Sequence, residues 1–432
     1  MISILRNNLL KLFGSNALIK PVWFIYMYSV ISKLGSEDFG SFTIFLAIIT
    51  IVTQLLDAGL VNKTYVLLND SKFSELFGTN NLEQLLIQIK VIIAILFSIL
   101  TIITSILFFS NYIFIIFFGV LIFISIYLTQ QYRVIFRSHE FFTIESICVV
   151  LERVLVILLT IDIFFNPYGF DKYINRYAVG YIVFLIFAIF IFERKIGHQF
   201  TFFKLNDYLL VLNQAGSLYV NNIILSIRQR LPYFILEYIG TRSIVGIYSS
   251  AYRFVESYMF LPNSVVQVNY AQFSKKASLA TDIVKDVWKT HLLIFVPTLI
   301  ICTSSIILMP FIITLLLGDE FLAYINEYSL AILIFLPNGS YYLLTSLSNI
   351  YYIQHKVNYL YILNFSTLVI TQFLFFYLFG IIGSIISMLL SEYIMIFEYH
   401  YALKNKTNLR KSFTLDVFSF IISVTFVTYT LI

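Results

Sequence analysis

The sequence contains too little charge for a soluble protein and too few cysteines for a disulfide-bonded one. Asp, Glu, Lys and Arg together make up 12% of the 432 residues, hydrophobic residues make up 59%, and the mean hydropathy is +0.88. Because ordinary soluble domains carry about twice this share of charge, the composition indicates an integral membrane protein. The two cysteines, Cys148 and Cys302, lie far apart within apolar runs, which excludes a disulfide framework.

Motifs for nucleotide binding, metal binding and catalysis are also missing. No phosphate-binding loop of the type G-x-x-x-x-G-K-[ST] occurs, so ATP hydrolysis by this chain is not expected. No two of the five histidines have the spacing of metal ligands, and their positions near the ends of apolar runs predict that they lie at the membrane interface. We expect no catalytic residues, no metal or other cofactor, and no nucleic acid partner.

Long apolar runs dominate the rest of the sequence. Runs of roughly 20 residues, enough to cross about 30 Å of hydrocarbon as an α-helix, recur along the chain. They predict an all-α polytopic membrane protein with two six-helix lobes. The twelve expected spans are 15–34, 40–68, 84–109, 112–137, 142–165, 174–193, 212–238, 245–268, 290–317, 322–352, 357–379 and 381–403. The run at 414–432 is a possible thirteenth helix, and the sequence leaves open whether it crosses the membrane.

A basic, aromatic segment separates the two sets of six spans. The predicted organisation is an N-terminal lobe over 1–193, a cytoplasmic or interfacial linker over 194–211, a C-terminal lobe over 212–403, and a basic loop with the possible extra helix over 404–432. If the N-terminus is cytoplasmic, 18 of the 28 Lys and Arg residues fall on the cytoplasmic side and four in outside loops. The positive-inside rule therefore predicts a cytoplasmic N-terminus.

The second and eighth spans share a layout at an offset of 206 residues. Gly40 and Phe42 open the second span, as Gly246 and Tyr248 open the eighth. Each span then carries a stripe of mostly polar residues at helical spacing. The two stripes are Thr43, Ala47, Thr50, Gln54 and Asp57, and Ser249, Arg253, Glu256, Phe260, Asn263 and Gln267. Because polar side chains avoid lipid, both stripes are predicted to face an interior cavity.

Three further spans add polar residues to this predicted cavity. The residues are Gln214, Asn221 and Arg228 at heptad spacing in the seventh span, Glu152 and Arg153 in the fifth, and Asn338 in the tenth. Structural roles remain open for several of them. Neighbouring charges can form local ion pairs, and buried amides often hydrogen-bond adjacent helices.

The local pairs that stay open are Arg253 with Glu256, Arg230 with Glu237, and Glu152 with Arg153. Arg228 and Arg230, two positions apart, point about 200° away from each other around the helix. They therefore cannot both point into one cavity unless Pro232 distorts the helix.

The candidate cavity residues divide into a substrate-binding set and an ion-coupling set. The first set is Arg153, Arg228, Arg253, Gln214, Asn221, Asn263 and Asn338, and the second is Asp57, Glu152 and Glu256. With Lys20 and Arg230 as two further candidate cations, the balance of charge leans positive. Each central arginine costs roughly 2.5–3.5 kcal/mol to insert into a membrane, so these residues predict a ligand or a pathway, and an anionic ligand is the simplest.

Several of these features together resemble a known family. They are the two six-helix halves, the sequence GIYSSAYR at 246–253 and the following NYAQFSKKA at 269–277, within the longer run 230–253. They resemble the polysaccharide flippases, the Wzx-type O-antigen and capsule exporters of the multidrug/oligosaccharidyl-lipid/polysaccharide superfamily, which includes the MATE transporters. The resemblance covers residues 1 to about 405 and does not identify the sugar.

The resemblance implies a MATE-like flippase of a bacterial inner membrane. Its cargo would be an undecaprenyl-diphosphate-linked oligosaccharide repeat unit of O-antigen, capsule or a related polysaccharide. Its partners would be membrane lipid, a proton or sodium as coupling ion, and possible polysaccharide polymerase and assembly proteins. A diphosphate cannot enter hydrocarbon unpaired, and arginine binds phosphate oxygens in bidentate fashion.

Four other functions are weighed against this one. A membrane glycosyltransferase or polymerase is disfavoured because the outside loops are short, and a channel because no pore loop is present. A lipid II or teichoic-precursor flippase shares the same chemistry and differs only in cargo. A multidrug or cation antiporter of the same superfamily shares the fold, but the predicted arginines disfavour a cationic drug.

Overall fold

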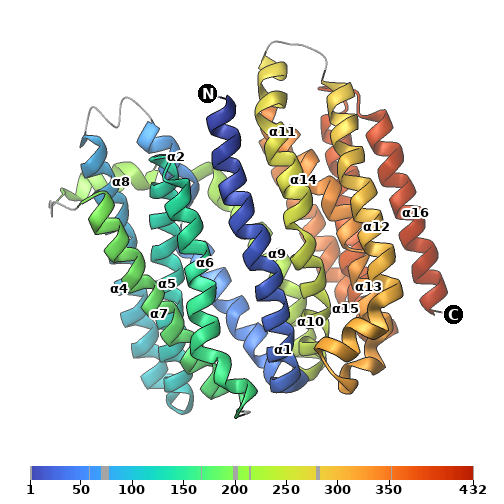
Figure 1. Ribbon diagram of the computed structural model, residues 1–432, viewed down its shortest axis with the longest axis horizontal. Helices are drawn as coiled ribbons and strands as arrows, with labels where there is room; N and C mark the ends of the chain where they lie inside the picture. The colour runs from blue at the N-terminus through green and yellow to red at the C-terminus, as the bar shows by residue number, and fades with distance from the viewer. Residues whose placement is uncertain are drawn as a thin grey trace. The chain divides into compact units, whose positions relative to one another are not determined.

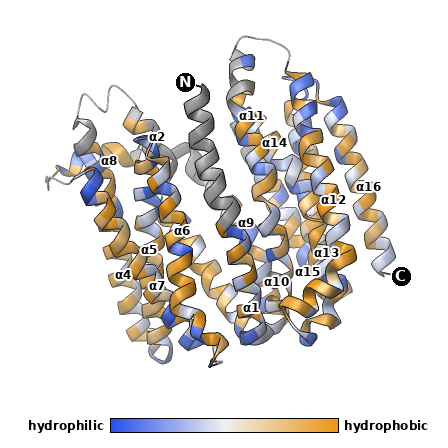
Figure 2. Ribbon diagram, viewed as in Figure 1, coloured by the Kyte–Doolittle hydropathy of each residue, from blue (hydrophilic) through white to orange (hydrophobic). Residues whose placement is uncertain are grey.

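The computed structural model describes residues 2–57, 59–69, 77–166, 168–197, 203–213, 216–278, 283–351 and 353–431. Within these ranges the secondary structure consists of helices and turns without any strand, which confirms the predicted all-α class (Figure 1). Apolar residues line the long helices such as α4 (Thr79–Phe108) and α12 (Val284–Leu316) along their length (Figure 2). This pattern is typical of helices surrounded by lipid.

The other helices occur in the following order along the chain. The first part contains α1 (Ile2–Asp57), α2 (Leu60–Asn69), α5 (Ile113–Ser138), α6 (Phe142–Thr160), α7 (Phe170–Lys195) and α8 (Leu205–Asn213). The second part contains α9 (Gly216–Ile239), α10 (Arg242–Tyr258), α11 (Phe260–Ser278), α13 (Ile325–Ile332), α14 (Phe335–Ile350), α15 (Gln354–Leu403) and α16 (Arg410–Leu431). Short 3₁₀ helices η1 (Ser110–Tyr112), η2 (Ile161–Phe164) and η3 (Asp319–Tyr324) lie between them.

Two of the long helices each contain two of the predicted spans, joined at a glycine. Gly35 in α1 has φ 76° and ψ 173°, and Gly380 in α15 has φ 60° and ψ −136°. These backbone conformations favour glycine because a Cβ atom would clash with the neighbouring backbone. The breaks fall between the predicted first and second spans and between the predicted eleventh and twelfth.

Eight helical segments in the described ranges are long and apolar enough to cross a membrane by length and composition alone. Two of them, Ile19–Asp57 and Tyr359–Leu403, contain the glycine breaks, and Arg410–Leu431 is the predicted thirteenth helix. The protein is therefore a multi-pass membrane protein. The predicted spans at 142–165, 212–238 and 245–268 also form helices, α6, α9 and α10–α11, but these helices carry more charged residues, among them those of the predicted site.

The chain divides into two compact units. The first unit comprises Met1–Tyr26 and Ser41–Ile227, and the second comprises Met27–Gly40 and Arg228–Ile432. In the first unit α5 packs against α4, α6 and α7, and in the second α14 packs against α11, α12 and α15. The division passes through α1 and α9, whereas the predicted lobes end at 193 and begin at 212. The predicted lobe boundaries, drawn from the repeat, stay a prediction.

Within the second unit, α1 and α10 cross at the two glycines that the repeat places in register. A Cβ atom added at Gly40 would lie 1.9 Å from the carbonyl oxygen of Arg242, and one added at Gly246 would lie 1.9 Å from that of Ser36. Residues 36 and 242 are separated by the same 206 positions as 40 and 246. The crossing is therefore reciprocal, as a local two-fold axis between two equivalent helix segments requires.

Gly246→Ala is expected to destabilise the protein by about 1–3 kcal/mol, the usual cost of overpacking. The methyl group would overlap a backbone oxygen, which cannot move aside as a flexible side chain can. Thermal unfolding in detergent measures the change. Gly119→Ala is the matched control, because its Cβ would meet only the ring of Phe45, at 3.0 Å. Equal stability of the two variants would contradict the close crossing of α1 and α10.

Candidate functional site

The second unit contains a fully buried network around Arg228 of α9. The Arg228 side chain donates from Nε to Asn364 Oδ1 at 2.7 Å, and from Nη2 to Ser391 Oγ at 3.1 Å and to Glu392 Oε1 at 2.9 Å. Asn364 in turn donates to the Ser391 carbonyl oxygen at 2.7 Å. All three partners belong to α15, so the guanidinium is satisfied by a helix that the sequence interpretation did not include in the site.

The arginine two positions later on α9 has a different partner. Arg230 Nη1 lies 3.3 Å from Glu256 Oε1 on α10. The pair predicted as an alternative, Arg230 with Glu237, does not form, because Glu237 pairs with Arg242 at 3.1 Å. Arg228 contacts α15 and Arg230 contacts α10. The two side chains reach different helices, as expected for residues that lie two positions apart and point about 200° away from each other.

Arg253 of α10 has no carboxylate partner within the described ranges. Its guanidinium carbon lies 5.1 Å from the centre of the Phe39 ring, a cation–π contact, and its Nε has no hydrogen-bond partner. The alternative pair of Arg253 with Glu256 does not form, because Glu256 contacts Arg230. The side chain is only partly buried, and no acidic residue in the described part of the second unit forms an ion pair with Arg253.

In the first unit, two arginines share one buried carboxylate. Glu152 forms an ion pair with Arg133 and accepts a hydrogen bond from Tyr181 Oη at 3.3 Å. Arg153 Nη2 lies 4.0 Å from Glu152 Oε1, and its guanidinium carbon lies 4.3 Å from the centre of the Trp23 ring. The neighbour pair Glu152–Arg153 is therefore a weak contact at the edge of ion-pair distance. Around Glu152, two arginines of the first unit therefore face one carboxylate, which leaves an excess of one positive charge.

Asp57, the third candidate carboxylate, is paired inside the first unit. Lys90 Nζ of α4 lies 2.6 Å from Asp57 Oδ1, and the Lys90 side chain has no solvent exposure. Lys90 Nζ also lies 3.3 Å from the Tyr127 carbonyl oxygen and 4.4 Å from the centre of the Tyr127 ring. Burying these charges without each other would be costly, so the two residues stabilise each other.

The four candidate amide residues differ in what the structure shows. Asn338 is buried and donates from Nδ2 to the carbonyl oxygen of Ile334, the residue before α14, at 2.8 Å. Asn263 is partly exposed and accepts from Gln267 at 3.2 Å. Gln214 lies outside the described residues, and Asn221 belongs to α9 with its side chain outside the description.

A buried cluster that the sequence interpretation missed joins four helices of the second unit. Asp416 of α16 lies 2.7 Å from His400 Nε2 and 3.4 Å from His291 Nε2, and it accepts a hydrogen bond from Ser340 at 2.5 Å. His291 is 1% exposed and His400 is 8% exposed. These two histidines are therefore packed between helices, each with a ring nitrogen facing a buried carboxylate of α16, and their predicted interfacial depth stays a prediction.

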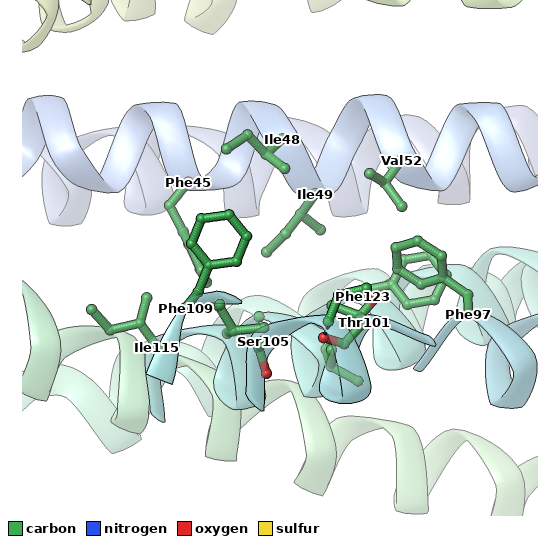
Figure 3. Close-up of a pocket in the computed structure, with 14 residues that line it drawn as sticks. Phe45, Ile48, Ile49, Val52, Phe97, Thr101, Ser105, Phe109, Ile115 and Phe123 are labelled. Carbon is green, nitrogen blue, oxygen red and sulfur yellow. Dashed lines mark hydrogen bonds between the residues drawn. The ribbon is translucent and has the colours of Figure 1, made fainter. Parts of the chain in front are cut away.

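An apolar hollow of about 290 Å³ lies in the first unit between α1, α4 and α5. In Figure 3, Phe45 and Ile49 project from α1 towards the helices opposite, which contribute Phe97, Phe109 and Phe123 to the lining. The hollow has no charged lining residue, and the hydroxyls of Thr104 and Ser105 are bonded to backbone carbonyls of their own helix. This hollow is suited to hydrocarbon and not to a phosphate group.

Comparisons with solved structures agree with the architecture. A multidrug-resistance MATE transporter of the MOP superfamily in an inward-facing conformation superimposes with a TM-score of 0.73 at 14% identity, over 93% of this chain and 99% of that one. The lipid II flippase MurJ, in an inward closed conformation, superimposes with a TM-score of 0.69 at 12% identity, over 96% and 92% of the two chains. The chain has the MATE and MurJ fold. No family model matches the chain, and no curated protein matches its sequence.

A third neighbour has this fold with a differently charged pocket. It is a MOP-superfamily transporter from Pyrococcus furiosus, for which reverse polarity of the binding pocket suggests a different function. Its TM-score is 0.61 at 13% identity, over 92% of this chain and 93% of that one. Together the three comparisons support the predicted MATE and flippase-like fold, and the proteins compared are transporters and a flippase.

Proposed function

We propose that the protein is a flippase that moves a polyprenyl-diphosphate-linked oligosaccharide across a bacterial inner membrane by alternating access. The cargo class is the undecaprenyl-diphosphate repeat unit of O-antigen, capsule or a related polysaccharide, and the proposed orientation has a cytoplasmic N-terminus. The observation that carries the proposal is Arg253, a partly buried arginine without a carboxylate partner in the described ranges. An unpaired buried guanidinium is unfavourable on its own and becomes favourable when a phosphate binds.

Each unit, taken by itself, supports an anionic cargo. Among the described residues of the second unit, Arg228 and Arg230 each have a carboxylate partner and Arg253 has none. In the first unit Glu152 is shared between Arg133 and Arg153. The aromatic rings of Phe39 and Trp23 hold Arg253 and Arg153 by cation–π contacts that leave the N–H groups free to bind oxygen atoms. A diphosphate provides such oxygens.

Two other functions fit the same fold. A lipid II or teichoic-precursor flippase would use the same diphosphate chemistry, and MurJ is a lipid II flippase with this fold. A multidrug or cation antiporter would require a cavity that attracts cations. The surplus arginines oppose that function, and the Pyrococcus furiosus transporter is an example of this fold in which reversed pocket polarity suggests a different function.

Ion coupling forms the second part of the proposal. Of the three candidate carboxylates, Asp57 and Glu152 are buried in ion pairs, whereas the side chain of Glu256 is 36% exposed. Glu256 lies three positions after Arg253 and is bound by Arg230. We propose that Glu256 exchanges its partner during the cycle and binds the proton or sodium ion that drives transport. One elementary charge crossing about 100 mV supplies roughly 2.3 kcal/mol, enough to bias two states of similar energy.

Arg253→Ala is expected to lower the rate of flipping of undecaprenyl-diphosphate-linked oligosaccharide at least tenfold, because a charge-assisted bond to phosphate contributes about 1.5–3 kcal/mol. Purified protein in vesicles, with accessibility of the glycan to an added enzyme as readout, measures the rate. Arg253→Lys should retain an intermediate rate, since lysine keeps the charge and loses the bidentate geometry.

Arg242→Ala is the matched control, because Arg242 belongs to the same helix and its side chain is 59% exposed. If the Arg253→Ala variant flips cargo at the same rate as this control, the proposed cargo-binding role of Arg253 is contradicted.

The same vesicles test whether flipping is coupled to an ion gradient. An imposed proton or sodium gradient should accelerate flipping, and Glu256→Gln should remove the acceleration. Rates indifferent to both gradients would favour passive flipping while leaving the role of Arg253 intact.

A further inference from the structure

The end of α15 and the start of α16 enclose a hollow of about 520 Å³ that has no part in the proposed transport site. The hollow belongs entirely to the second unit. Its lining residues are Phe397, His400, Tyr401, Lys404, Thr407, Asn408, Leu409, Arg410 and Phe413. They combine two cations, three aromatic rings and several hydrogen-bonding groups, a composition unlike that of the purely apolar hollow in the first unit.

Between Glu398 and Asp416 the Asp, Glu, Lys and Arg residues of the chain are all basic. The loop and first turn at 404–411 contain Lys404, Lys406, Arg410 and Lys411, and no Asp or Glu occurs between Glu398 and Asp416. Lys404 and Arg410 line the hollow, and neither forms an ion pair within the described ranges. Four like charges in eight residues repel one another, so an anion bound among them is stabilised.

Polar groups inside the hollow are suited to receive oxygen atoms. The Thr407 hydroxyl is buried and has no hydrogen-bond partner in the described part of the chain, although it lines the hollow. The Lys404 ammonium lies 3.8 Å from the centre of the Tyr401 ring, which holds it in place while leaving its N–H groups available. A buried hydroxyl without a partner is costly, and a ligand oxygen would satisfy it.

The aromatic wall distinguishes a lipid from a free ion. Tyr401 is 67% exposed and Phe413 is 40% exposed, and both belong to helices long and apolar enough to cross the membrane. Aromatic residues at the ends of such helices lie at the level of the lipid headgroups. A ligand with an anionic head and apolar chains can contact the cations and the rings together, whereas inorganic phosphate contacts only the cations.

We propose that this hollow binds the phosphate of an anionic phospholipid from the surrounding leaflet. The headgroup phosphate lies between Lys404 and Arg410 with the Thr407 hydroxyl donating to it, and the acyl chains pass along Tyr401 and Phe413. The hollow is also connected to α16, because its lining residue His400 lies 2.7 Å from Asp416 of that helix. Bound lipid thereby favours the arrangement in which α16 is attached to α15.

The test uses the full chain in detergent, titrated with phosphatidylglycerol and, separately, with phosphatidylcholine, and monitored by native mass spectrometry. Phosphatidylglycerol should bind more tightly than phosphatidylcholine. K404Q/R410Q should weaken phosphatidylglycerol binding about thirtyfold, roughly the effect of removing two cations near a lipid surface. K404R/R410K, which keeps both charges, should bind nearly as well as the unaltered protein and shows that the loop still folds.

The matched control is K285Q/K289Q, which removes two exposed lysines from α12. An equal loss of binding in this control would overturn the proposal, because it would indicate a general effect of surface charge. Inorganic phosphate at millimolar concentration forms the second arm. Displacement of phosphatidylglycerol by inorganic phosphate at similar affinity would also overturn it, since the site would then bind free phosphate. Neither result depends on the proposed transport activity.

Discussion

Arg228→Ala is expected to destabilise the second unit by about 3–5 kcal/mol, the usual cost of removing one partner from a buried ion pair. The change would leave Glu392 charged in a site where its side chain is 4% exposed, and would also remove the donor that binds Asn364 and Ser391. Thermal or denaturant unfolding in detergent measures the loss. The expected effect is larger than that of Arg253→Ala, since Arg253 has no carboxylate partner to leave behind.

A double variant separates a structural role of Arg228 from a cargo-binding one. Arg228→Met with Glu392→Leu replaces both charges by apolar groups and should recover much of the stability, because the desolvation cost of both ions disappears. If this variant is stable and still flips cargo, Arg228 is structural. The opposite result has two parts: the double variant is stable but does not flip cargo, and Arg228→Ala alone unfolds at the same temperature as the unaltered protein. That result would favour the sequence-based assignment of Arg228 to the cargo.

The fold could be predicted from the sequence because the signal for each span is local. Runs of about 20 apolar residues specify helices without reference to the rest of the chain. Even the two breaks within α1 and α15 coincide with glycines at predicted boundaries, Gly35 and Gly380. The offset of 206 residues also identified Gly40 and Gly246, which turn out to share a reciprocal crossing.

The partners of the site residues could not be predicted, because pairing between helices depends on rotation and depth that one sequence does not encode. Arg228 pairs with Glu392, 164 positions away, and Asp57 pairs with Lys90 across two helices. Of the local pairs that the sequence left open, neither Arg253 with Glu256 nor Arg230 with Glu237 forms. A usable signal existed for Glu392, since it is one of only two acidic residues, with Glu398, in the apolar run 381–403.

The partners of two histidines also could not be predicted from their positions in the sequence. Position near the end of an apolar run predicted an interfacial location but did not reveal that His291 and His400 are buried against Asp416. The signal that could have revealed these partners was Asp416 itself, an acid near the start of an otherwise apolar terminal helix. A charge at that place is costly in lipid and needs partners on neighbouring helices. The cluster gives α16 a specific attachment to α12, α14 and α15.

A disulfide between Cys residues introduced at Ser36 and Ser243 is expected to form readily and to reduce flipping at least tenfold. The two hydroxyl oxygens lie 2.7 Å apart, so the side chains point towards each other across the crossing of α1 and α10. The adjacent Gly40 and Gly246 hold the two backbones in close contact. Under the proposed alternating access, the predicted outer ends of the second and eighth spans separate once in each cycle, and a covalent bond between them prevents that step.

The experiment compares flipping in vesicles before and after reduction of S36C/S243C. Cys148 and Cys302 are buried and are first replaced by serine so that only the introduced pair can react. Reduction should restore flipping, which a protein damaged by the substitutions would not do. The single variants S36C and S243C, under the same oxidant, should flip at the normal rate. Full flipping by the oxidised double variant, with the disulfide confirmed by mass spectrometry, would show that this crossing stays closed throughout transport. The cargo would then have to pass without separation of α1 and α10, and alternating access through this crossing would be wrong.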